Sequence, residues 1–289
     1  MAAPPLLNLY LPFQQRDQLL AGNSIFGVVA RAVQAAGWTL TLRKPYEPAS
    51  GPGYHLALNR AVTQPDMLTA RCCYLEPFYR IEATNDRWHW EVAAYPFQPE
   101  PGTDWFRRHW VARIFADMPI TRARHIFMPL QGKLSSRRHF QMKSPLDMIE
   151  DTLSAAPDHD IFATLHPRET YSPDEIAALQ RIGGRFHLST APSLSLLASC
   201  DYVVTQNSSL AFLGYFARKP AVLFADIDFH HIARSVRRLG VKSAFDTISD
   251  LPDFGAYLHW FLRDNAISLS QPEAQPRITA RLRDHGWPI

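Results

Sequence analysis

The chain lacks several features that mark well-known classes of protein. Only three of its 289 residues are cysteine, and two of them, Cys72 and Cys73, are adjacent. This pattern builds neither a disulfide framework nor a zinc-binding spacing. The apolar runs all end before the ~20 residues that a membrane-spanning helix needs. The opening MAAPPLLNLYLPF has no basic segment ahead of its apolar residues, so no signal peptide is predicted. We therefore expect a cytoplasmic protein.

Charge and short motifs exclude further classes. The formal net charge is +3, from 30 basic and 27 acidic residues, which argues against a nucleic-acid partner. The basic segments SSRRHF and RSVRRLG leave peripheral contact with the inner face of a membrane open. The sequence contains no glycine-rich dinucleotide fingerprint, no P-loop and no Gly-x-Ser-x-Gly elbow. Nicotinamide chemistry, ATP hydrolysis and serine-hydrolase chemistry are therefore disfavoured.

From about residue 123 the sequence alternates between strand and helix patterns. The predicted strands are HIFMPLQ, DIFATLHP, RFHLS, DYVVTQ and AVLFA, and the predicted helices between them are SPLDMIEDTLSA, SPDEIAALQRIG, SLSLLASC and SSLAFLGYFAR. Ser144 and Ser172 stand where helix caps are expected, each followed by a proline. Such alternation predicts an α/β fold with a parallel, Rossmann-like sheet and helices on both faces.

The first part of the chain is less regular. LLNLYLPF and TLTLR are predicted strands on either side of a helix at about 24–36, and HLALNR is a third strand. The aromatic segment 72–97 is compatible with antiparallel strands or with long loops. Residues 96–105 form the best linker candidate, and a helix is expected from Asp104 to Phe115. We predict a smaller N-terminal α/β domain, 1–120, and a second domain, 121–289, that ends in C-terminal helices.

Polar side chains follow four of the predicted strands. They are Gln131, then His166, Pro167 and Arg168, then Gln206, Asn207, Ser208 and Ser209, and finally Asp226, Asp228, His230 and His231. The carboxyl ends of parallel strands lie at one edge of a sheet, and ligands of such sheets bind there. The sequence therefore predicts a ligand site at this edge.

The chemistry of these residues favours a phosphate-bearing ligand. His166 is suited to donate a hydrogen bond to a phosphate oxygen, with Arg168 beside it. The turn QNSS precedes a helix, and a helix N-terminus either caps itself with a hydroxyl or binds an anion. One capping residue is enough, so the second hydroxyl and the amide favour a bound phosphate.

The segment ADIDFHHIA brings two aspartates and two histidines within six positions. Their spacing matches no zinc signature, so we expect no metal and no other cofactor. Asp228, His230 and His231 are instead interpreted as substrate contacts, or Asp228 as a helix cap.

The stretches FMPLQ, SPLDMIEDTL, LHP and CDYVVTQNSSLAFLGYFARKPAVLF resemble the capsule polysaccharide biosynthesis family of bacterial Kdo transferases. The resemblance covers about 110 residues, 126–231. It implies a GT-B architecture, a CMP-Kdo donor and a grip on the cytidine nucleotide by His166, Pro167, Ser208 and Ser209, with Gln131 and Asn207 as secondary contacts. The family usually has an acidic residue soon after Pro-Leu-Gln, where this chain reads GKLSSRRHF.

The expected function is that of a metal-independent glycosyltransferase that moves a sugar from a nucleotide-activated, CMP-linked donor to a surface polysaccharide or glycolipid. A carboxylate of the N-terminal domain would orient the acceptor hydroxyl, and the candidates are Asp17, Glu76 and Glu82. Two alternatives stay open: a nucleotide-sugar epimerase of the same architecture, and a non-catalytic protein that binds sugar nucleotides.

Overall fold

The computed structural model describes residues 3–12 and 16–289, and the chain divides into two compact units. Unit 1 consists of Met1–Tyr95 and Phe261–Ile289, and unit 2 of Pro96–Trp260. This division differs from the predicted one, 1–120 and 121–289, at both ends of unit 2. The helix at 104–115 packs within unit 2, while the last residues of the chain add a strand and a helix to unit 1.

Unit 1 contains a six-stranded sheet with the order β12-β5-β4-β3-β1-β2. Its strands are β1 (Leu6–Tyr10), β2 (Thr39–Arg43), β3 (Tyr54–Leu58), β4 (Met67–Cys72), β5 (Phe78–Glu82) and β12 (Ile267–Ser268). Its helices are α1 (Arg16–Ala21), α2 (Ile25–Ala35), the 3-10 turn η2 (Arg87–His89), α3 (Glu91–Ala94) and α11 (Ala274–Asp284). The predicted strands and the helix α2 are confirmed. In the aromatic segment, β5 pairs antiparallel with β4 and β12, so the first of the two alternatives, antiparallel strands, holds for its start, whereas η2 and α3 were not predicted.

One face of the unit 1 sheet is covered by α2 and α11. Alternate residues of β1, Leu7 and Leu9, join a buried cluster with Val29 of α2 and Ile278 of α11, as the two-residue period of a strand requires. Helix α2 begins where Ser24 accepts a hydrogen bond from the N–H of Gly27 at 3.1 Å. Unit 1 is therefore an α/β unit in which the C-terminal helix α11 covers part of one face of the sheet.

Unit 2 contains a second six-stranded sheet, with the order β11-β10-β9-β6-β7-β8. Its strands are β6 (His125–Pro129), β7 (Asp160–Thr164), β8 (Phe186–Leu188), β9 (Tyr202–Thr205), β10 (Ala221–Leu223) and β11 (Arg234–Ser235), and all of them are paired in parallel. Its helices are α4 (Asp104–Phe115), α5 (Pro145–Ala155), α6 (Pro173–Ile182), α7 (Ser193–Ser199), α8 (Ser209–Phe216), α9 (Val236–Asp246) and α10 (Phe254–Leu258), after which the π-helical turn η3 (His259–Asp264) follows.

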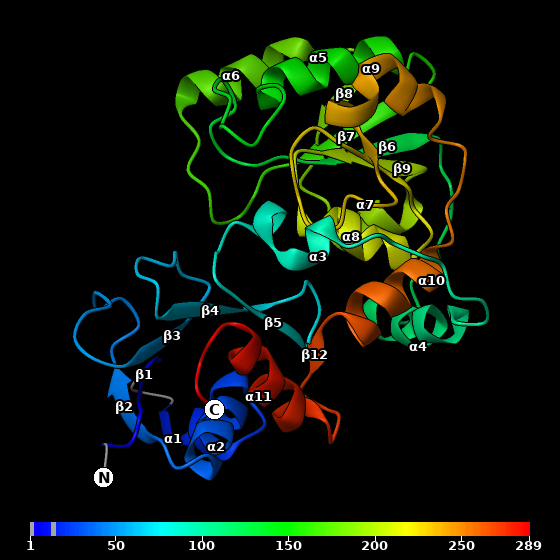
Figure 1. The fold of residues 1–289 in the computed structure, drawn as a ribbon. Coiled ribbons are helices and arrows are strands. Elements are labelled where there is room, and N and C mark those ends of the chain that lie inside the picture. The colour runs from blue at the N-terminus through cyan, green and yellow to red at the C-terminus, as the bar shows by residue number, and fades with distance from the viewer. Residues whose placement is uncertain (1–2, 13–15) are drawn as a thin grey trace. The chain divides into compact units, whose positions relative to one another are not determined.

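Every predicted strand and helix of the alternating region is confirmed, including the caps at Ser144 and Ser172, both of which form capping boxes. Helices α5, α6 and α9 lie over one face of the sheet and α7 and α8 over the other (Figure 1). Ile126 and Met128 of β6 join the cluster under α5, α6 and α9. In the part of the chain that the structure describes, no helix is long and apolar enough to cross a bilayer.

Candidate functional site

The carboxyl edge of the unit 2 sheet gathers the loops that carry the predicted site residues. All its strands are parallel, so the loops after β10, β9, β6 and β7 leave from the same edge in that order. From β6 the chain proceeds to β7 on one side and later returns to β9 on the other. The pair β6–β9 is therefore the topological switch point, where α/β sheets bind their ligands.

The turn that follows β9 ties these loops together. Thr205 Oγ1 donates to the carbonyl of Pro129 at 2.9 Å, and Gln206 Nε2 donates to the carbonyl of Lys143 at 3.1 Å. Asn207 Nδ2 lies 3.4 Å from the carbonyl of Asp226, beyond β10. Gln206 and Asn207 are both buried, so their amides hold the edge in place, a role that the sequence pattern did not indicate.

Ser208 is the N-cap of α8, and its Oγ accepts a hydrogen bond from the N–H of Leu210 at 3.3 Å. Ser209 is the first residue of the helix and is exposed. One serine thus meets the capping requirement of the helix. The hydroxyl of the other lies at the helix N-terminus, where the backbone dipole favours an anion.

The loop after β7 sets the tautomer of His166. The N–H of Arg168 donates to His166 Nδ1 at 3.2 Å, and the N–H of His166 itself donates to Tyr171 Oη at 2.8 Å. Because Nδ1 accepts a hydrogen bond, the neutral ring carries its proton on Nε2. His166 is half-buried, and Pro167 and Arg168 are exposed. The ring is therefore arranged as a hydrogen-bond donor through Nε2.

Two glutamates connect the loop after β6 to the loop after β7. Glu175 accepts hydrogen bonds from the N–H groups of Ser172 and Leu134, and these lower the pKa of its carboxyl. The side chain of Glu169 packs on Gly132, where an added Cβ would lie 2.3 Å from Glu169 Oε2. Gln131, the predicted contact, directly precedes this glycine and is half-buried. Sequence reasoning missed both links.

The residues after β10 do not assemble a metal centre. Asp226 forms an ion pair with Arg237 at 2.7 Å, and Asp228 is buried. His230 Nδ1 donates to the carbonyl of Ile227 at 2.7 Å, and burial lowers the pKa of its ring. Its ring stacks on that of His231, with centroids 4.4 Å apart. Among the described residues, these side chains supply no set of three ligand atoms within reach of one ion. The helix that follows, α9, has Ser235 and not Asp228 at its N-cap position.

The three candidate carboxylates of unit 1 have different surroundings. Asp17 in α1 is 93% exposed and lies 3.4 Å from Arg16. Glu76 is exposed and accepts a hydrogen bond from Tyr79 Oη at 2.6 Å. Glu82 is only 3% exposed, and its two oxygens accept from Arg80 at 2.6 Å and from Arg281 at 2.9 Å. Glu82 is thus neutralised by two guanidinium groups, whereas Asp17 is accessible to solvent.

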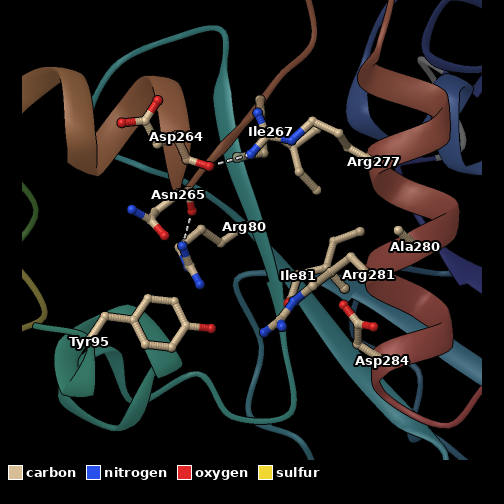
Figure 2. Close-up of a pocket in the computed structure, with 11 residues that line it drawn as sticks. Arg80, Ile81, Tyr95, Asp264, Asn265, Ile267, Arg277, Ala280, Arg281 and Asp284 are labelled. Carbon is tan, nitrogen blue, oxygen red and sulfur yellow. Dashed lines mark hydrogen bonds between the residues drawn. The ribbon is translucent and has the colours of Figure 1, made fainter.

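Unit 1 also contains a pocket that the sequence did not predict. It has a volume of about 240 Å³ and is shown in Figure 2. We call it the arginine pocket; its lining residues are Tyr79, Arg80, Ile81, Tyr95, Asp264, Asn265, Ile267, Arg277, Ala280, Arg281 and Asp284. They come from 79–95 and 264–284, two distant segments that are joined by the pairing of β5 with β12 and by hydrogen bonds from Arg80 and Arg281. No local sequence signal could have indicated this site.

One group of side chains around Arg281 has three possible metal-ligand atoms within 4.8 Å of one another: Glu82, Glu91 and His285. Arg281 already donates to Glu82 at 2.9 Å and to Glu91 at 2.7 Å. The hydrogen bond from Arg281 lowers the pKa of Glu91 to about 2, and burial lowers the pKa of His285. The guanidinium therefore provides the positive charge that a metal ion would bring.

This pairing predicts a dependence of stability on pH. The pKa of Glu91 is about 2 in the folded protein and 4.5 ordinarily, so its contribution is fully present above pH 4.5 and is lost as the pH falls toward 2. We expect Glu91→Gln to flatten the pH dependence of the free energy of unfolding in this range, as measured by urea denaturation. The same change at the exposed Glu150 of α5 is the control, and an equal flattening by both would contradict the assignment.

Comparison with known proteins supports the architecture. No protein-family model and no curated protein sequence matches the chain. A solved β-Kdo 2,7 transferase, KpsC of Thermosulfurimonas dismutans, matches with a TM-score of 0.50 and 11% identity, over 98% of this chain and 100% of that one. A β-Kdo 2,4 transferase KpsC of the same organism has a TM-score of 0.45, 12% identity and coverages of 88% and 91%. The glycosyltransferase SnogD from Streptomyces nogalater has a TM-score of 0.33, 11% identity and coverages of 99% and 96%.

At 11% identity the first of these matches shows a shared fold, and the other two TM-scores are too low to add to it. The chain has the GT-B-like fold: two α/β units, each with its own largely parallel sheet, as the resemblance in sequence had implied.

Proposed function

We propose that the protein is a glycosyltransferase that takes its sugar from a nucleotide-activated donor, CMP-linked and Kdo-like. The observation that supports the proposal is that polar groups follow the neighbouring strands β9, β6 and β7 at the carboxyl edge of the unit 2 sheet. The Ser209 hydroxyl at a helix N-terminus, the Nε2 donor of His166 and the half-buried Gln131 all follow strands that end at this one edge. Hydroxyl, imidazole and helix dipole together suit a phosphate.

In this proposal the donor phosphate lies at the N-terminus of α8, held by Ser208, Ser209, His166 and Arg168. The helix dipole and the arginine stabilise the negative charge that develops on the leaving nucleotide, so the step needs no metal ion.

The remaining polar residues of this edge have supporting roles in the proposal. The shape of the phosphate site depends on Pro167, Gln206 and Asn207. The sugar or the acceptor is contacted by Asp228, His230 and His231. The acceptor is a surface polysaccharide or a glycolipid, and peripheral contact with a membrane belongs to the same proposal.

The acceptor hydroxyl requires a base, and the surroundings of the three carboxylates favour Asp17 and Glu76 over Glu82. A general base must have an oxygen free to take the proton. Both oxygens of Glu82 accept from arginines, and Glu76 accepts from Tyr79. Asp17 is exposed, with Arg16 at 3.4 Å as its ion-pair partner.

The experiment that tests the proposal is calorimetric titration of the protein with CMP, UMP, UDP and ADP. We expect binding of CMP with an affinity at least tenfold above that for the other three. Incubation of a CMP-linked sugar with and without an acceptor then separates a transferase from an epimerase, which needs no acceptor. Binding without turnover would indicate the non-catalytic alternative, and the absence of binding by every nucleotide would overturn the proposal.

A further inference from the structure

The arginine pocket of unit 1 has the composition of a binding site for an anionic ligand. Its lining holds three arginines against two aspartates, together with two tyrosines and one asparagine. Its volume of about 240 Å³ suits a small ligand of monosaccharide size. We propose that this pocket binds a hydroxylated ring that carries one anionic group, a carboxylate or a phosphate.

The three arginines of the pocket differ in their hydrogen-bond partners: two of them pair with glutamates, and Arg277 donates to backbone carbonyls. Arg80 and Arg281 are held by Glu82, and Arg281 also by Glu91. Arg277 instead donates to two backbone carbonyls, those of Arg263 at 3.1 Å and of Asp264 at 2.6 Å.

The surroundings of Arg277 favour an incoming anion. Burial, followed by the charges of Arg263 and Arg80, lowers the pKa of Arg277, although the carboxylates of Asp264 and Glu273 act in the opposite direction. In Figure 2 the Asp264 carboxylate points away from Arg277 and only its carbonyl faces the guanidinium. A ligand carboxylate or phosphate at Arg277 would offset the cost of burying its charge, and the guanidinium fork matches either group.

The remaining lining residues suit hydroxyl groups. Figure 2 shows the guanidinium groups of Arg80 and Arg281 and the hydroxyl of Tyr95 pointing toward the same space. Tyr95 Oη donates to Glu91 at 2.8 Å, so its oxygen can still accept a hydrogen bond from a ligand. Asp284 and Tyr79 add further oxygen atoms to the lining. Because sugar hydroxyls both donate and accept, this mixture of groups fits a polyhydroxylated ring better than a bare ion.

The pocket lies in unit 1, whereas the sheet edge proposed to bind the nucleotide lies in unit 2. The role of its ligand as the acceptor sugar rests on the proposed transferase function, whereas the binding itself does not. Failure of the pocket proposal can be told apart from failure of the transferase proposal. Binding to the pocket is measured without nucleotide, on the full chain, with substitutions that lie in unit 1 only.

The test is calorimetric titration with three probes that share one ring: glucose, glucuronate and glucose 6-phosphate. We expect at least one anionic probe to bind at least tenfold more tightly than glucose. Arg277→Gln is expected to weaken that binding at least tenfold. Arg283→Gln on the same helix removes an exposed arginine outside the pocket and should leave the affinity unchanged.

Preference for glucuronate would identify a carboxylate ligand, and preference for glucose 6-phosphate a phosphate ligand; either result supports the proposal. Equal binding of all three probes, or no binding of any, would overturn it. Tyr95→Phe is the second variant, because Tyr95 is partly exposed and its hydroxyl donates only to the exposed Glu91. We expect a threefold or greater loss of affinity with normal thermal stability. Unchanged affinity in both Arg277→Gln and Tyr95→Phe would refute the site.

Discussion

Replacing Glu82 by glutamine is expected to lower the free energy of unfolding by about 3–5 kcal/mol, the cost of leaving buried charges without their partner. Glu82 is 3% exposed and holds Arg80, whose side chain is 6% exposed, at 2.6 Å and Arg281 at 2.9 Å. Glutamine has nearly the same shape but no charge, so the two guanidinium groups lose their compensation. Arg80 then depends on its hydrogen bond to the carbonyl of Asn265. Urea denaturation, monitored by circular dichroism, measures the loss.

Two further variants make this prediction specific. Glu76→Gln changes an exposed carboxylate that is bonded to Tyr79, and it should alter stability by less than about 0.5 kcal/mol, as surface substitutions usually do. The double variant Glu82→Gln/Arg80→Gln removes one charge of each sign and should recover part of the loss. If Glu82→Gln abolished transfer activity while stability stayed normal, Glu82 would be a base and not a structural ion-pair partner.

Ser209→Ala and His166→Ala are each expected to weaken the binding of CMP about tenfold to hundredfold. A hydrogen bond to a charged group contributes about 1.5–3 kcal/mol, and each 1.4 kcal/mol corresponds to about a tenfold change in affinity. Ser209 does not cap α8, since Ser208 does. The Ser209 variant should therefore fold with nearly normal stability, so that its loss of affinity can be attributed to the ligand.

Ser24→Ala is the matched control for the serine variants. Ser24 caps α2 in unit 1 by accepting from the N–H of Gly27 at 3.1 Å, and its loss should cost about 0.5–2 kcal/mol of stability. The affinity of the folded protein for CMP should not change. Normal CMP affinity in both Ser209→Ala and His166→Ala would mean that the turn after β9 only starts a helix.

Local sequence patterns predicted the elements of unit 2 because each of them carries its own signal. The helix α6 has Ser172 as cap, Glu175 to complete the capping box and Gly183 after its last residue, and these signals act within a few residues. The strand β9 is short, β-branched and buried throughout, as a strand covered on both faces must be. The polar residues at the strand ends could be assigned to one edge because parallel strands allow only that arrangement.

Contacts between distant segments could not be predicted in the same way. Gln131 was visible as a polar residue after a strand, but the packing of Glu169 on Gly132 depends on how two loops meet. C-terminal helices were predicted, but their return to unit 1 was not, because the two-residue strand β12 has no periodicity of its own and a helical pattern does not say which sheet α11 covers.

The sequence by itself determined the alternating strands and helices from β6 to β10, the caps at Ser144 and Ser172, the parallel sheet of unit 2 and the edge at which its polar residues lie, since all of these follow from short-range periodicity and turn chemistry. Only the tertiary structure decided that Glu82 is a buried ion-pair partner. It also decided that Ser208 and not Ser209 caps α8, and that Arg80, Arg277 and Arg281 share one pocket. The role of Glu82 and the arginine pocket depend on burial and on pairing across nearly 200 residues of chain, which no local pattern encodes, whereas the choice between Ser208 and Ser209 depends on the backbone geometry at the start of α8.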